Sequence, residues 1–349
     1  MDKNFKYSFE NWIIQCCRST ESDLRRFLKR VLKRSGFQIK EDDYKTYRGE
    51  KYKTVHNMLA IRGNPNVCLV AHTDVCRDHA FDIPKVDPVI KIEKINDKMT
   101  AIIQDRHCKV QVGGDDRLGV AINTWIALNT GYDVSLLFTT DEEVGLVSAE
   151  YVKFSELMNF DILLQVDRGN NSNQLVTTIG GYDLCSGKTA KRLLKIAEDI
   201  GLPRYNVNGL MTDVLALITN HMCKEAVNMT CGYHMSFGAQ ADEFIDIQEA
   251  KDTVKYVSSI IKYYYLEEDK NEAVLEEIDF DLEEDIEEIH TSQTFTDYSE
   301  RSNNRRGRSS LSRIGRNDLW SEESYEKDKR EGSYYDGDCS RGGWPGDLY

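Results

Sequence analysis

The stretch Gly113-Gly114-Asp115-Asp116-Arg117-Leu118-Gly119 brings two adjacent carboxylates to the start of an apolar segment. The apolar residues that follow recur with the spacing of a helix: Val120, Ala121, Ile122, Trp125, Ile126 and Leu128. Carboxylates in the first turn of a helix interact favourably with the helix dipole. We therefore predict a helix that begins at the aspartate pair and holds both carboxylates at its N-terminal end.

Three further groups of acidic side chains each follow a short apolar run. Residues 67–71 precede His72 and Asp74, residues 134–140 precede Asp141-Glu142-Glu143, and residues 162–166 precede Asp167. Continuous apolar runs of this length are typical of strands that are covered on both faces. Functional groups of an open α/β sheet gather beyond the carboxyl ends of its strands, so we expect these side chains to lie near Asp115.

The chain alternates between predicted strands and helices as far as about residue 265. Residues 8–35 have helical spacing, with Ser19 or Thr20 as a cap and Gly36 as a stop. The other predicted elements are an antiparallel ribbon over 89–112 that turns near Asn96, a helix over 186–200, a helix from Thr212 through Leu217, a strand over 226–229 and a helix from Asp246 through about 263. This alternation indicates an α/β layered fold with a largely parallel or mixed sheet.

One predicted helix carries a cationic face opposite its apolar stripe. That face is formed by Arg25, Arg26, Lys29, Arg30, Lys33 and Arg34. We interpret it as the solvent-facing side of a packing helix rather than as a binding patch, since charged helical faces usually face water.

The composition narrows the class of protein. The 349 residues carry a net charge of −14, which disfavours specific nucleic-acid binding and attraction to an anionic membrane. No run approaches the ~20 apolar residues that a membrane helix needs, and residues 1–7 lack a signal-like apolar core. The nine cysteines form no Cys-x-x-Cys pair, which is typical of a reducing compartment. We expect a cytoplasmic protein with neither a nucleic acid nor a membrane as its partner.

The composition changes near residue 266. Residues 267–288 are dominated by glutamate and aspartate, and arginines then alternate with serine, asparagine and glycine. Segments with charge blocks and few apolar residues do not bury enough surface to fold. We predict that residues 1–265 form one domain and that 266–349 are a disordered tail, whose partner the sequence does not identify.

The chemistry of the acidic groups favours a metal centre. Carboxylates with a single early histidine suit hard or borderline divalent cations, and without a cation they would repel one another. Asp74 lies on the same face of an extended segment as His72, where it could fix the imidazole. Glu142 and Glu143 point in different directions, so one can bind metal while the other handles a proton.

The order of these motifs resembles that of the co-catalytic dinuclear zinc exopeptidases, a group of aminopeptidases, peptidase T-like tripeptidases and related deacylases. Their pattern is His-x-Asp, Gly-(Ala)-Asp-Asp, Glu-Glu-x-Gly, Asp and a late His. Here it corresponds to His72-Thr73-Asp74, Gly114-Asp115-Asp116, Glu142-Glu143-Val144-Gly145, Asp167 and Gly232-Tyr233-His234, over residues 50–265. The resemblance implies a three-layer α/β/α fold with a mixed, mostly parallel sheet.

The resemblance also implies a role for each residue. Asp115 would bridge two zinc ions, His72 and Asp167 would complete one site, and Glu143 would belong to the other. Glu142 would be the general base that activates a metal-bridging water, and Asp74 would orient His72. The resemblance allows a cis peptide bond between Asp115 and Asp116, and Mn²⁺ or Co²⁺ as alternatives to Zn²⁺.

The sequence departs from the pattern at its late histidine. Three residues beyond His234, where the tripeptidase-like pattern has its ligand histidine, stands Phe237, and a phenyl ring cannot bind metal. Either His234 is the ligand after a local shift, or Cys231 contributes, or the second site is weak or empty. We assign the ligand role to His234.

A second departure is size. His72 and Asp115 are 43 positions apart, and Asp167 and His234 are 67 apart, so neither gap holds an inserted domain of ~100 residues. We therefore predict a lidless metallopeptidase, most simply an aminopeptidase-like exopeptidase on small peptides. The alternatives are a deacylase of acylated amino acids and a weakened peptidase fold that serves as a binding scaffold.

Overall fold

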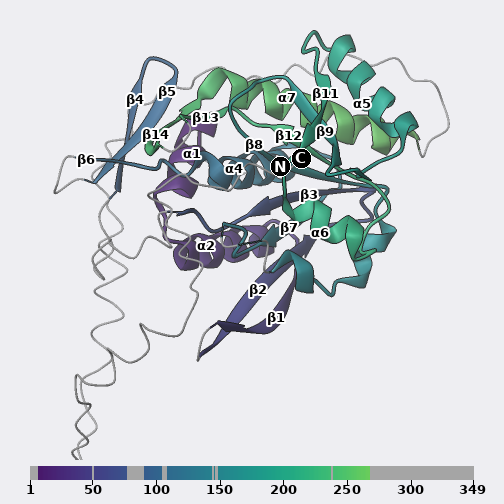
Figure 1. The fold of residues 1–349 in the computed structure, drawn as a ribbon, viewed down its shortest axis with the longest axis horizontal. Helices are drawn as coiled ribbons and strands as arrows, with labels where there is room; N and C mark the ends of the chain where they lie inside the picture. Colours follow the sequence, from purple (N-terminus) through teal and green to yellow (C-terminus); the bar gives the residue numbers. More distant parts are fainter. Residues whose placement is uncertain are drawn as a thin grey trace, which may run out of the picture. The chain divides into compact units, whose positions relative to one another are not determined.

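Four parallel strands form the centre of the molecule. In spatial order they are β7 (Ser135–Thr139), β3 (Val67–His72), β8 (Ile162–Arg168) and β12 (Ala226–Thr230) (Figure 1). All four segments were predicted as strands from their apolar runs. The computed structural model describes residues 7–48, 51–76, 90–103, 108–143, 145, 148–236 and 239–267.

Further strands, most of them in antiparallel pairs, extend this sheet at both edges. On one side β2 (Lys51–Ile61) pairs with β7, and β1 (Gln38–Arg48) pairs with β2. On the other side β9 (Gln174–Ile179) pairs antiparallel with β12 and with β10 (Tyr182–Asp183), and β11 (Tyr205–Gly209) pairs with β9 in parallel. The predicted mixed sheet is therefore confirmed, with its parallel pairs mainly at the centre.

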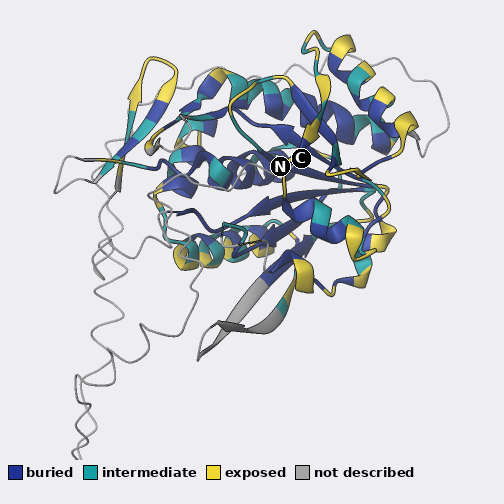
Figure 2. Ribbon diagram, in the orientation of Figure 1, coloured by how far each residue is buried: buried dark blue, intermediate teal, exposed yellow. Residues whose placement is uncertain are grey.

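Helices cover the two faces of the sheet. Their bounds are α1 (Phe9–Arg18), α2 (Glu21–Arg34), α4 (Gly114–Asn129), α5 (Gly187–Asp199), α6 (Asp213–Thr219) and α7 (Ile247–Glu267), with short 3₁₀ helices η1 (Ala149–Tyr151) and η2 (Ser155–Asn159). Successive residues of β3 enter opposite cores. Leu69 belongs to the core that includes the apolar faces of α1, α2, α4, α5 and α7, whereas Val70 belongs to the core that includes α6 and residues of the 3₁₀ helices. The predicted three-layer α/β/α architecture is confirmed, and the strands between its layers are buried (Figure 2).

A second, smaller sheet lies beside the N-terminal end of α4. It consists of β4 (Ile90–Ile95), β5 (Lys98–Ile103), β6 (Cys108–Val110), β13 (Tyr233–Ser236) and β14 (Ala239–Asp246). The ribbon of β4 and β5 was predicted, including its turn, where Asn96 has a φ of 54°. Its pairing with β14 through Ile245 and Met99 was not predicted. That pairing brings a late hairpin to the start of α4.

Several helix ends have the caps that the sequence predicts. Thr20 Oγ1 accepts a hydrogen bond from the main-chain N–H of Asp23, and Asp246 Oδ1 accepts one from Glu249. Gly36 follows α2 with a φ of 85°, a left-handed conformation that favours glycine. Thr212 is the exception: it precedes α6, but its side chain makes no capping hydrogen bond and bonds to Gln165 instead.

Helix α1 is attached to α4 by buried polar contacts. The indole Nε1 of Trp12 donates to Thr124 Oγ1 at 2.7 Å. The fully buried Arg117 donates through Nη1 to the carbonyl oxygens of Cys16 at 3.2 Å and Ser19 at 2.8 Å. The helix that precedes the whole α/β core is thus part of it.

The predicted disordered tail lies almost entirely outside the described residues, the last of which is Glu267 at the end of α7. The domain boundary at residue 265 stays a prediction. Among the helices that the structure describes, none has the length and apolar character needed to cross a membrane.

Candidate metal centre

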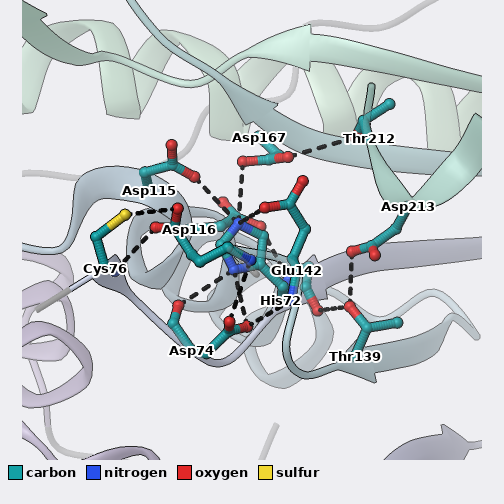
Figure 3. A network of polar contacts seen from close by, with 12 residues as sticks. His72, Asp74, Cys76, Asp115, Asp116, Thr139, Glu142, Asp167, Thr212 and Asp213 are labelled. Atoms are coloured by element: carbon teal, nitrogen blue, oxygen red, sulfur yellow. Dashed lines mark hydrogen bonds and ion pairs between the residues drawn. The ribbon is translucent and has the colours of Figure 1, made fainter. Parts of the chain in front are cut away.

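His72 occupies the middle of the cluster at the carboxyl end of β3. Its imidazole is fully buried, and Nε2 lies 3.0 Å from Asp115 Oδ1, 3.5 Å from Asp167 Oδ1 and 3.9 Å from Glu142 Oε2 (Figure 3). Nδ1 lies 3.1 Å from the main-chain oxygen of Asp74 and 3.4 Å from its Oδ1. The structure thus gathers four groups that are far apart in the sequence.

The two aspartates at the start of α4 have different environments. Asp116 Oδ2 accepts from the main-chain N–H of His72 at 3.2 Å, and Oδ1 accepts from Gly119 at 3.1 Å. Asp115 instead directs Oδ1 to the His72 ring, and the peptide bond between the two aspartates is cis. Asp116 therefore joins α4 to β3, while Asp115 faces the cluster.

Gly119 explains why this motif ends in glycine. A Cβ there would lie 2.1 Å from Asp116 Oδ1 and 2.4 Å from the main-chain oxygen of Val166. Any larger residue would force α4 away from β8 and would displace the Asp116 carboxylate.

Asp74 holds the loop that carries both glutamates. Its Oδ1 accepts from the main-chain N–H of Glu142 and its Oδ2 from that of Glu143, each at 3.2 Å. Asp74 was predicted to orient His72; it lies beside the ring, and it also fixes the position of both glutamates. Glu142 turns toward His72, and Glu143 turns toward Cys76, whose main-chain N–H donates to Glu143 Oε1 at 3.0 Å.

A buried network that the sequence did not predict positions Asp167. Gln165 Nε2 donates to Asp167 Oδ2 at 3.0 Å, and Thr212 Oγ1 donates to Gln165 Oε1 at 2.6 Å. Asp213, also buried, accepts from Thr139 Oγ1 at 2.7 Å (Figure 3). The signal was present in the sequence, because Gln165 is a lone polar residue inside an apolar run and needs a buried partner.

Arg25 corrects the prediction that the cationic face of α2 is turned to solvent. Its guanidinium Nη1 donates to Thr73 Oγ1 at 3.2 Å, between His72 and Asp74. Glu21 on the same helix accepts from Thr73 Oγ1 at 3.0 Å and also from Thr140. Arg26, by contrast, is exposed as predicted. One turn of α2 therefore contacts the residues that follow β3 and β7, next to the cluster.

The structure does not bring His234 to the cluster, contrary to its predicted role as a metal ligand. Its Nε2 lies 2.8 Å from Glu249 Oε2, and its ring stacks on Phe244. The physical reason is strand alternation: Tyr233 directs its hydroxyl to Asp115 Oδ2 at 3.1 Å, so the next side chain of β13 points to the opposite face. Phe237 lies outside the described residues.

Glu243 of β14 takes a place near the cluster that was not predicted. It is fully buried and accepts from the main-chain N–H of Gly113 at 2.6 Å and of Asp115 at 3.2 Å. Burial, with the charge of Asp115, raises its pKa to about 7. Its two hydrogen bonds fix the loop that delivers Asp115.

The cluster has more acid than its one imidazole can neutralise. Burial, with added repulsion from Asp115, raises the pKa values of Glu143 and Asp167 to about 8. Burial also raises the pKa of Glu142 well above its ordinary value. Burial disfavours the charged form of His72, but Asp167 and its neighbours outweigh this and raise the pKa of His72. A bound cation would compensate this excess negative charge.

The residues fit a divalent metal ion. Ligand atoms of His72, Asp116 and Asp167 lie within 4.8 Å of one another. Asp115 is the better ligand of the aspartate pair, because both oxygens of Asp116 already accept main-chain N–H groups. Ligands of a tetrahedral zinc ion lie about 3.4 Å apart, and the distances from His72 Nε2 to Asp115 and Asp167, 3.0 and 3.5 Å, are close to this spacing. Asp167 Oδ1 is buried and accepts no hydrogen bond.

Known structures with this fold include aminopeptidases and glutaminyl cyclases. An aminopeptidase PepT from Bacillus cereus superposes with a TM-score of 0.58 at 12% identity, over 73% of this chain and 97% of that one. An aminopeptidase from Desulfurococcus kamchatkensis superposes with a TM-score of 0.52 at 14% identity, over 77% of this chain and 99% of that one. A glutaminyl cyclase from Porphyromonas gingivalis superposes with a TM-score of 0.52 at 14% identity, over 74% of this chain and 97% of that one. No protein-family model and no curated protein matches by sequence.

These likenesses define the class of the fold. The chain has the zinc-exopeptidase-like α/β/α fold that its motif order predicts, and nearly the whole length of each neighbour is matched. At such low identity the likeness extends to the fold, and the activity of this chain has to be argued from its own side chains.

Proposed function

We propose that this chain is a metal-dependent hydrolase of peptide or amide bonds, acting as an exopeptidase of the aminopeptidase type on small substrates. The observation that carries the proposal is the convergence of His72, Asp115, Glu142 and Asp167 at one end of the central strands. Three of these groups suit a metal ion and the fourth stands beside them, which is the arrangement that hydrolysis at a metal centre requires.

The residues divide between two metal positions. His72, Asp115 and Asp167 would hold one ion, and Asp115 and Glu143 would contribute to a second, with zinc as the expected metal. When bound, such ions polarise a carbonyl oxygen and lower the pKa of water.

Glu142 is the proposed general base and acid. Its carboxylate lies at the edge of the cluster, 3.9 Å from His72 Nε2, and burial raises its pKa well above the ordinary value. A base whose pKa approaches the working pH can both accept a proton and return it. Glu142 would take the proton of the attacking water and later protonate the leaving amine.

Other residues would position these groups. Asp74 fixes the main chain of Glu142, and Gln165 holds Asp167 through Nε2. The Tyr233 hydroxyl donates to Asp115 Oδ2, leaving Oδ1 for the cluster. Each contact reduces the freedom of a reacting or metal-binding side chain before substrate arrives.

The test is turnover of a panel of aminoacyl amides and dipeptides by the full chain, before and after removal of metal by a chelator. We expect turnover that the chelator abolishes, that Zn²⁺, Mn²⁺ or Co²⁺ restores, and that Glu142→Gln removes. Turnover that persists in the chelated protein would overturn the mechanism.

The same panel separates the alternatives. N-acyl amino acids test the deacylase, and peptides with N-terminal glutamine test the cyclisation for which a structural neighbour is named. A scaffold built on this fold would bind no metal after zinc supplementation, so elemental analysis distinguishes it from an enzyme.

A further inference from the structure

Helix α2 ends in a cationic surface that lacks counter-charges. Arg30, Lys33 and Arg34 are exposed, and none of the three has an ion-pair partner among the residues that the structure describes. Arg26 and Lys29, nearer the start of the helix, do have carboxylate partners. We refer to Arg30, Lys33 and Arg34 together as the basic end of α2.

The positions of these three residues on the helix set like charges beside one another. Arg30 and Arg34 are four positions apart, and Arg30 and Lys33 are three apart. Side chains at these spacings are neighbours on a helix surface, and like charges there destabilise the helix. An anionic partner would therefore stabilise the basic end of α2.

The chain itself supplies such a partner directly after its last described helix. Helix α7 ends at Glu267, and residues 268–282 then contain seven acidic side chains and one lysine. We refer to residues 268–282 as the acidic segment. Free polyanions are repelled by the overall charge of −14, whereas a segment joined to the fold has a high effective concentration near it.

A short series of contacts links the end of α7 to the end of α2. The Tyr265 ring lies 5.1 Å from the Tyr132 ring, between centroids, and the main-chain oxygen of Tyr132 accepts from Arg62 Nη2 at 2.9 Å. The Arg62 guanidinium lies 4.6 Å from the centroid of the Phe37 ring, and Phe37 follows α2 by three positions. Fifteen residues span up to ~50 Å when extended, so the acidic segment can reach the basic end of α2.

We propose that the acidic segment docks on the basic end of α2 in the same chain. Opposite charge provides the attraction, and attachment to α7 keeps the two surfaces close together. Single exposed ion pairs contribute little and are screened by salt, so the docking depends on several charges and weakens at high ionic strength. The proposal concerns a surface outside the metal centre and is independent of the proposed hydrolase.

Carbodiimide cross-linking of the full chain tests the docking, because the reagent joins a lysine amine to a carboxylate in contact with it. Peptide mass spectrometry locates the links, and a mixture of ¹⁵N-labelled and unlabelled protein separates links within a chain from links between chains. Lys188 is the reference lysine, since it is exposed on α5, whose Arg192 also contacts the end of α7.

We expect Lys33 to link to the acidic segment of its own chain. These links should form at least about fivefold more often than those of Lys188, since opposite charge and attachment together raise the local concentration of carboxylates. At 1 M NaCl, where charges are screened beyond about 3 Å, the difference between the two lysines should disappear.

A double variant removes the neighbouring charges and keeps the reporting lysine. Arg30→Glu with Arg34→Glu should reduce the links of Lys33 to the frequency of Lys188. The matched control is Lys191→Glu with Lys224→Glu, which reverses two exposed cations in another part of the fold. The control should leave the links of Lys33 unchanged.

Four outcomes would overturn the proposal: Lys33 links no more frequent than those of Lys188, links that join different chains, links that persist in the Arg30 and Arg34 variant, and binding of a single-stranded oligonucleotide that this variant abolishes. The last would mean that an external polyanion occupies the basic end of α2. Far-ultraviolet circular dichroism identifies a variant that does not fold, and the comparison of Lys33 with Lys188 in the wild type then decides.

Discussion

Asp74 shows how one side chain can serve two parts of a site. Its position beside His72 follows from a two-residue spacing on a strand, which the sequence displays. Its hydrogen bonds with the main chain of Glu142 and Glu143 depend on the position of the loop that follows β7, and no local sequence pattern predicts them. The carboxylate therefore couples the strand end to the loop of the proposed base.

We predict that Asp74→Asn lowers the affinity for the first metal ion about 10- to 100-fold, the usual effect of losing a group that supports a ligand. The amide keeps one acceptor oxygen but turns an N–H₂ group toward the other main-chain N–H. Isothermal titration with Zn²⁺ measures the change.

Asp42→Asn is the matched control, because Asp42 Oδ2 also accepts a main-chain N–H, that of Lys153, in a different part of the fold. Equal affinities for the Asp74 variant and the wild type would contradict the supporting role.

Glu142→Gln should reduce kcat by about 10²- to 10⁴-fold, the contribution of general acid–base catalysis, while the bound metal stays unchanged. The amide has nearly the same shape but accepts no proton. Steady-state kinetics and elemental analysis of the same sample give both numbers. Glu150→Gln, an exposed change in the same region, should have wild-type kinetics. A Glu142 variant that loses its metal would place this residue among the ligands instead.

The site could be predicted only as far as its residues carry local signals. His72, Asp115, Glu142 and Asp167 each follow an apolar run or a glycine pair, and the structure gathers them. The direction of His234 could not be predicted, since it depends on which face of a short strand Tyr233 occupies.

At the scale of elements, α2 supports the site although its sequence gives only an amphipathic helix. Arg25 belongs to the cationic face, yet it sits one turn from the helix start, where Thr73 lies within reach. Helical periodicity identifies the face that packs and does not identify which charged residue near its border meets a partner.

We predict that Arg25→Met lowers the free energy of unfolding by about 1.5–3 kcal/mol, the value of a hydrogen bond from a charged group. Arg26→Met, the exposed neighbour, should change it by less than about 0.5 kcal/mol. Urea denaturation of both variants measures the difference. Equal effects of the two substitutions would mean that the contact with Thr73 does not stabilise the fold.

Long periodic or fully apolar elements and the ribbon of β4 and β5 were predictable, whereas strands β9, β11 and β13 were not. The central strands have apolar runs, and α4, α5 and α7 have apolar residues at helical spacing, so each pattern predicts its own secondary structure. Strands β9, β11 and β13 have mixed polarity: β11 is largely exposed, whereas β9 buries polar side chains such as Gln174 and Thr177. Their positions come from pairing with distant segments, which a single sequence does not display.

For the whole molecule, the buried acids link folding to pH. Glu143 and Asp167 have pKa values raised to about 8, whereas their ordinary values are 4.5 and 3.8. The folded, metal-depleted protein therefore holds protons that the unfolded chain releases. This contribution to stability is complete below about pH 4 and is lost as the pH rises through 8. The raised pKa of His72 acts in the same direction.

We predict that the melting temperature of the chelated protein falls between pH 5 and pH 8, and that Zn²⁺ reverses the fall at pH 8. Zinc at 100 times its dissociation constant should add about 2.7 kcal/mol. Differential scanning calorimetry at both pH values, with and without the ion, measures this. The double variant Glu143→Gln, Asp167→Asn should flatten the dependence. A chelated protein that becomes more stable toward pH 8 would contradict the link.

The anchoring of α1 on α4 has a consequence for biosynthesis. Trp12 and its partner Thr124 are 112 positions apart, so the first helix leaves the ribosome long before its docking surface exists. Until then its apolar face, with Trp12 and Ile13, has no core to enter, and nascent segments of this kind are what chaperones bind. Because of the order of synthesis, helix α1 docks in its final position only after α4 has been made.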